Sequence, residues 1–130
     1  MRNKSNASYN LGISLINSQD NYKNTQSIHC LYYSVLQMII YKLANLRYGA
    51  IPYNQQEEQS KNSSSHEWLL TKIRNEFKTG QEKAKFSENF RKLKSDRKDA
   101  DYGERLFTLE DATDCRAKTE LLLDSLRRIS

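Results

Sequence analysis

Apolar residues recur at steps of three and four along much of the chain, which is the period expected of helices that bury one face. The longest such segment covers residues 22–47. Its apolar surface extends beyond one face, which predicts contacts with several neighbouring helices or with a second copy of the chain. Residues 5–19 predict a shorter amphipathic helix. We expect the inward stripe of that helix to comprise Ala7, Leu11, Ser14, Leu15 and Ser18.

Turn and capping residues divide the rest of the chain. Ser64 and Thr108 are each followed three positions later by an acidic residue, a pattern that predicts a capping box at the start of a helix. We expect the helix that starts after Ser64 to end at Gly80, and the next helix to cover residues 84–101. Residues 49–63 are polar, lack a period and contain the only proline. They predict a binding loop or a disordered segment.

These elements predict an all-α fold, an up-and-down bundle of four or five helices that forms one domain over residues 1–130. The composition agrees, because the chain has one proline and four glycines but many strong helix formers. Cys30 and Cys115 lie in helical patterns without a Cys/His cluster, so we expect neither a metal site nor a disulfide, and no cofactor. No segment has the apolar length of a membrane helix, and we expect a cytoplasmic protein without membrane contact.

Positive charge is concentrated in one segment of the chain. The formal net charge is +5, and the segment from Lys83 to Lys98 alone holds seven basic residues against two acidic ones. Such a segment suits the phosphate backbone of RNA or an acidic protein, although a solvated helix face has the same composition. The candidates for nucleic-acid contact are Lys85, Arg91, Lys92, Lys94, Lys98 and, at the start of the preceding helix, His66.

A charged residue occupies an apolar position of the 84–101 helix. Its inward stripe comprises Phe86, Phe90, Leu93, Arg97 and Ala100. A guanidinium on such a stripe loses hydration and needs a partner. Asp101 follows Arg97 by one turn, so a local ion pair is one interpretation. The other is that Arg97 lines a cleft between helices or subunits, where its planar fork binds a phosphate.

Three short motifs on three expected helices together resemble a known family. The segment 93–102, LKSDRKDADY, resembles the Leu-x3-Arg-x2-Ala-Asp-Tyr signature of HEPN domains, the small helical-bundle proteins of prokaryotic toxin–antitoxin and defence systems. Tyr32-Tyr33 resembles the Tyr-Tyr pair of that family, and Ser65-His66 resembles its Ser-His step. The resemblance covers roughly residues 5–128 and implies a HEPN-like bundle.

The resemblance also implies partners and a site. HEPN proteins dimerise through their motif-bearing helices, and many are encoded beside a nucleotidyltransferase. By this resemblance the candidate catalytic residues are Arg97, Asp101 and Tyr102. Nuclease members carry an Arg and a His separated by four to six residues, and this pair acts on RNA across the dimer interface. Neither histidine of this chain, His29 or His66, stands at that distance after an arginine.

Two functions remain open from the sequence. The basic segment and the resemblance favour an RNA- or nucleotide-associated protein of a toxin–antitoxin or defence pair. The missing histidine argues against catalysis by an imidazole group and favours a helical dimerisation or interaction module without enzymatic activity.

Overall fold

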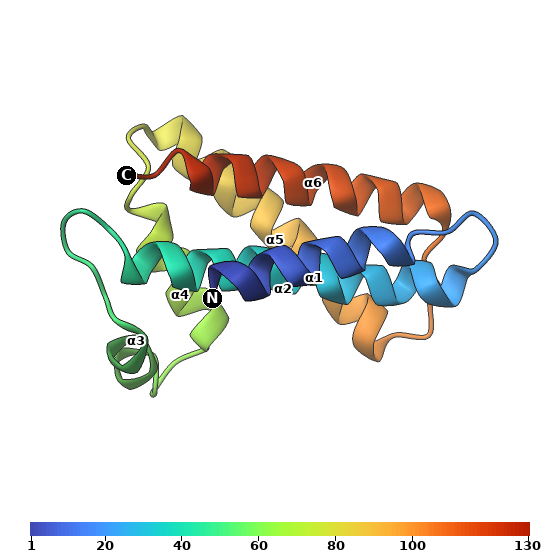
Figure 1. Cartoon of the computed structure of the whole chain (residues 1–130), viewed down its shortest axis with the longest axis horizontal. Coiled ribbons are helices and arrows are strands. Elements are labelled where there is room, and N and C mark those ends of the chain that lie inside the picture. The colour runs from blue at the N-terminus through green and yellow to red at the C-terminus, as the bar shows by residue number, and fades with distance from the viewer.

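A computed structural model describes residues 1–130, which form six helices and no strands. The helices are α1 (Arg2–Leu15), α2 (Asn21–Ala44), α3 (Tyr53–Gln59), α4 (Ser65–Arg74), α5 (Gly80–Tyr102) and α6 (Leu109–Arg127). The four long helices, α1, α2, α5 and α6, alternate in direction along the chain, as the colours in Figure 1 show. The two short helices, α3 and α4, follow α2 and precede α5 in the chain. The prediction of an all-α fold is confirmed, and the helix count is one higher than the upper expectation.

The central element of the bundle is α2, which packs against α1, α4, α5 and α6. Its fully buried side chains include Ile28, Leu31, Val35 and Ile39. The broad apolar surface of α2 is therefore covered within one chain. The sequence left two explanations for this broad surface, several neighbouring helices or a second copy of the chain. The neighbouring helices alone are enough to explain it.

The inward face of α1 differs from the predicted stripe. Leu11 is 54% exposed, and the buried positions are the small residues Ser5 and Gly12. The Ser5 hydroxyl donates to the carbonyl oxygen of Ser34 at 2.6 Å. A Cβ added at Gly12 would lie 3.1 Å from the Leu31 side chain. The prediction was wrong because α1 approaches α2 closely, and only small side chains fit between the two backbones.

The predicted helix starts after Ser64 and Thr108 are confirmed, whereas the boundary at Gly80 needed correction. The capping box at Thr108 is confirmed in full. Helix α4 begins directly after Ser64, but the Ser64 side chain makes no capping hydrogen bond, so the capping box predicted there does not form. Gly80 is the first residue of α5 rather than the end of α4, because the hydroxyl of Thr79 accepts from the amide of Glu82 and caps α5 there.

The segment 49–63 contains a helix where the sequence predicted a loop or disorder. Gln56 on α3 is buried, and its Nε2 donates to the carbonyl oxygens of Ile40 at 3.0 Å and Ile51 at 2.7 Å. This contact attaches the segment to the end of α2. A polar side chain fixes the helix, which explains why the segment has no apolar period.

None of the six helices combines the length and the apolar character needed to cross a membrane.

Candidate phosphate-binding site

Arg97 is buried where α5 meets α2, and only 7% of the residue is exposed. Its guanidinium carbon lies 5.0 Å from the centre of the Tyr32 ring and 5.9 Å from that of Tyr33. The distance from its Nη1 to Oδ2 of Asp101 is 3.6 Å, which is long for a hydrogen-bonded ion pair. The Nε of Arg97 has no hydrogen-bond acceptor in the protein. The guanidinium is therefore desolvated but only partly paired.

His29 of α2 is a closer partner of Asp101 than Arg97 is. Its Nδ1 lies 2.9 Å from Oδ2 and 3.1 Å from Oδ1 of the carboxylate. The His29 side chain is half exposed, whereas that of Asp101 is 20% exposed. When Nδ1 carries the proton and donates to Asp101, Nε2 keeps its lone pair and can accept a proton from a ligand. The arrangement has the chemistry of a general base held by a carboxylate.

The sequence did not indicate His29 as a site residue. His29 and Asp101 are 72 positions apart and lie on different helices, so no local spacing links them. One weak signal existed, because His29 precedes Tyr33 by four residues and therefore lies one turn away on the same face of α2. The structure shows that contact, with the two ring centres 4.6 Å apart.

His66 approaches the same cluster from the first turn of α4. Its Nδ1 lies 2.8 Å from the Tyr32 hydroxyl. Burial raises the pKa of Tyr32 well above its ordinary value, so the hydroxyl stays protonated and donates to Nδ1. Burial, followed by the charges of Arg97, Lys94 and Lys98, lowers the pKa of His66. His66 is thus neutral at pH 7, and its Nε2–H is available to an anionic ligand.

Tyr33 lies between the two histidines. Its ring centre is 4.6 Å from that of His29 and 6.2 Å from that of His66. The structure therefore brings together Arg97, Asp101, His66 and the Tyr32-Tyr33 pair from three helices. Of the candidate catalytic residues, Tyr102 is the exception: it is 82% exposed and forms no hydrogen bond with the cluster.

Three of the basic candidates lie on the side of α5 that faces α4. Arg91, Lys94 and Lys98 follow one another at steps of three and four, which places them on one flank of the helix. Glu67 of α4 lies 3.0 Å from Lys94 and 3.7 Å from Arg91. The hydrogen bond from Lys94 lowers the pKa of Glu67. Lys98 has no acidic partner, and this flank continues to Arg97 and His66.

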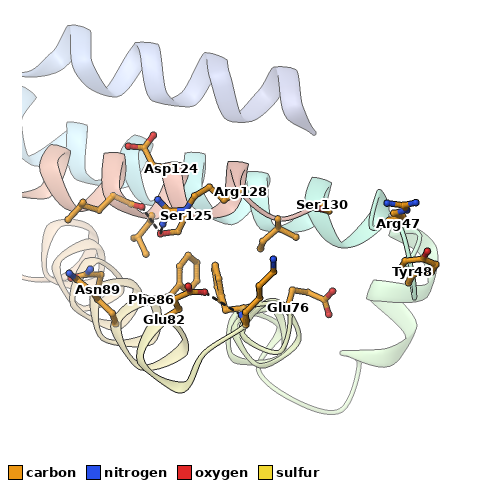
Figure 2. Close-up of a pocket in the computed structure, with 16 residues that line it drawn as sticks. Arg47, Tyr48, Glu76, Glu82, Phe86, Asn89, Asp124, Ser125, Arg128 and Ser130 are labelled. Atoms are coloured by element: carbon orange, nitrogen blue, oxygen red, sulfur yellow. Dashed lines mark hydrogen bonds between the residues drawn. The ribbon is translucent and has the colours of Figure 1, made fainter.

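The other two basic candidates are neutralised or lie elsewhere on α5. Lys92 borders the flank beside Arg91, but it pairs with Glu88 at 2.9 Å. Lys85 lines a groove of about 780 Å³ between the first turns of α5 and the last turns of α6, which Figure 2 shows. Three acidic side chains share this groove with the basic ones: Glu76, Glu82 and Asp124. The basic segment is therefore divided between different surfaces, and only the α4-facing flank reaches the Arg97 cluster.

His29 and Asp101 are two potential metal ligands, but no group of three or more His, Cys, Asp or Glu residues is arranged to hold a metal ion. The two cysteines form no disulfide, and neither makes a hydrogen bond with a residue of the cluster. Cys115 is buried beside Asp96, and burial raises its pKa to about 12. Its thiol is therefore not a nucleophile at neutral pH.

Comparisons of the chain with protein-family models, with curated proteins and with solved structures return no match. The resemblance to HEPN domains therefore depends only on the three short motifs of this chain. Most of the residues that carry it, though not Tyr102, lie in one place: α2 contributes the two tyrosines, α4 contributes His66, and α5 contributes Arg97 and Asp101.

Proposed function

We propose that this chain is a HEPN-like, RNA- or nucleotide-associated cytoplasmic protein of a toxin–antitoxin or defence pair, and that its Arg97 site binds a phosphate of the RNA. The observation that supports this most is the convergence of the three resembling segments on one partly neutralised, buried arginine. A guanidinium with a loose ion pair suits a phosphate, whose oxygens accept charge-assisted hydrogen bonds from a planar fork.

The charges around the cluster support an anionic ligand. Besides burial, the positive charges of Arg97, Lys94 and Lys98 lower the pKa of His66. These three charges therefore act on the same small region. Glu67 compensates Lys94, whereas Lys98 is exposed and unpaired. A phosphate between Lys98 and His66 would accept from a neutral Nε2–H and from an ammonium group. The phosphate would also supply the negative charge that Asp101 provides only in part to the buried guanidinium of Arg97.

One observation favours a ribonuclease within this proposal. The nucleases that the chain resembles place the histidine on the arginine helix, four to six residues after the arginine. Here the imidazole comes from His29 on α2, which lies against Asp101, the residue one turn after Arg97 on α5. An imidazole is therefore present in the cluster although no histidine follows Arg97 at that spacing. We propose that His29 Nε2 removes the proton of an RNA 2′-hydroxyl while Asp101 holds the ring in the required tautomer.

A second candidate is the helical dimerisation or interaction module without catalysis. The observation that favours it is the burial of Arg97 and its stacking on Tyr32 and Tyr33, which also suits a purely structural residue. A homodimer is a proposal that both candidates share, whereas a nucleotidyltransferase partner belongs to the first candidate. Light scattering at tens of micromolar tests the homodimer, and a monomer mass would count against it.

RNA binding tests the proposed function most simply. We expect a labelled single-stranded decanucleotide to bind with strong salt dependence, because each neutralised phosphate releases counterions. Lys98→Glu should weaken binding at least tenfold. Lys4→Glu is the matched control, because Lys4 is also exposed and forms no ion pair but lies on α1, which contributes no side chain to the cluster. Equal losses in both variants, or no binding by the wild type, would reject a defined site.

A further inference from the structure

We infer that the α4-facing flank of α5 is a track for the backbone of single-stranded RNA, and that it ends in a second phosphate subsite formed by Arg74, Ser87 and Arg91. This inference rests on the proposed function and specifies its ligand: an RNA several nucleotides long that reaches from the Arg97 cluster towards the first half of α5.

The second subsite is a shallow depression of about 580 Å³ at the end of α4. Its lining comprises Arg74, Ala84, Ser87, Glu88, Arg91, Lys92 and Ser95. Ser87 is 5% exposed, and its hydroxyl makes no hydrogen bond in the protein. A serine inside a helix usually donates to a carbonyl oxygen three or four residues earlier, as Ser27 and Ser34 do, or points to solvent, so a buried hydroxyl without a partner requires an explanation. A ligand oxygen at the depression would provide the missing partner after a side-chain rotation.

The charges of this depression favour an anion. Arg74 forms no ion pair, and Arg91 is 63% exposed with its closest carboxylate oxygen, on Glu67, at 3.7 Å. Glu88 is the one acidic residue in the lining, and it pairs with Lys92 at 2.9 Å. Two guanidinium groups therefore remain for a ligand. Together with the serine hydroxyl they match the acceptor oxygens of a phosphate.

The depression and the Arg97 cluster lie on one continuous flank. Ser87, Arg91, Lys94 and Lys98 follow at steps of four, three and four, which is the repeat of a single helix face. From Ser87 to Lys98 the rise along α5 is about 17 Å, at roughly 1.5 Å per residue. A ligand that contacts both ends must therefore carry several phosphates in series. RNA has such a repeat, and an open, shallow flank admits it.

Comparison of a short and a long RNA tests the track. The probes are a labelled uridine dinucleotide, which cannot span the flank, and a labelled uridine decanucleotide, which can. In the double variant Arg74→Gln/Arg91→Gln, we expect decanucleotide binding to fall at least tenfold and the salt slope to fall by about 0.7 for the lost phosphate. Dinucleotide binding should not change. Lys85→Gln, on the groove side of α5, is the control and should leave both probes unaffected.

Ser87→Ala adds a reading that does not depend on charge. Because the hydroxyl is buried without a partner, its removal should leave the unliganded protein as stable as the wild type or more stable, while decanucleotide affinity falls a few-fold. Unchanged decanucleotide affinity in the double variant would overturn the track and leave the Arg97 site standing if Lys98→Glu still weakens binding. A polyglutamate peptide that displaces the decanucleotide at equal charge concentration would also overturn the track, because the flank would then suit an acidic protein.

Discussion

Replacement of Arg97 by methionine separates binding from packing, because methionine keeps most of the side-chain volume and removes the charge. The variant loses the stacking of the cation on Tyr32, worth about 0.5–2 kcal/mol. It regains part of this through the contact of sulfur with the ring, about 0.3–1.5 kcal/mol. It also removes a buried Nε donor without an acceptor, a group whose burial costs about 1–3 kcal/mol. Asp101 keeps its partner His29.

These contributions nearly cancel, so we expect Arg97→Met to unfold in urea with a free energy within about 1 kcal/mol of the wild-type value. RNA affinity should fall at least tenfold, which corresponds to about 1.4 kcal/mol of binding free energy. Circular dichroism measures the first quantity and fluorescence anisotropy with the decanucleotide measures the second. Arg127→Met is the control: Arg127 is 55% exposed and pairs only with Asp124, so neither quantity should change.

The opposite pattern would refute this reasoning. A loss of more than about 3 kcal/mol in stability, together with unchanged RNA affinity, is the result expected when a buried ion pair is broken. Arg97 would then be a structural residue, and the helical interaction module would be the better account of the cluster.

Two further predictions concern the histidines. Because folding lowers the pKa of His66, the folded state binds a proton less readily than the unfolded chain. The contribution of neutral His66 to the free energy of unfolding is therefore complete above the pKa of about 6.5 that His66 has in the unfolded chain, and it is lost as the pH falls below that value. In urea denaturation from pH 7.5 to 5, the wild type should lose more stability than His66→Gln, and parallel curves would contradict the assigned environment. For His29, we expect His29→Gln to keep RNA affinity within about threefold, since glutamine can still donate to Asp101, and to lose RNA cleavage on a denaturing gel. Intact RNA after prolonged incubation with the wild type would reject the catalytic role.

The sequence predicted those features that depend on local periodicity. The stripe through Phe90, Leu93 and Arg97 is buried as expected, because a helix of that length has one core-facing side whatever its neighbours are. The cap at Thr108 was also predictable, since both of its hydrogen bonds join residues three positions apart. Local spacing alone determines both features.

The features that the sequence missed depend on contacts between distant residues. Leu11 is exposed because α1 packs through Ser5 and Gly12, and the short distance between two helices cannot be read from one of them. Glu67 was assigned to a capping box, but in the fold it accepts from Lys94 of another helix. The contact of His29 with Asp101 likewise exists only after α2 and α5 have packed together.

The pKa of His66, measured by NMR in the free protein and at saturating RNA, tests the central claim most directly. In the free protein, burial and the charges of Arg97, Lys94 and Lys98 hold this pKa below its ordinary value. A phosphate bound beside these cations offsets their charge and accepts a hydrogen bond from the ring. We therefore expect saturating RNA to raise the pKa of His66 by about one unit or more. A His66 pKa that stays the same in free and RNA-saturated protein would contradict it, because the phosphate would then lie away from the Arg97 cluster.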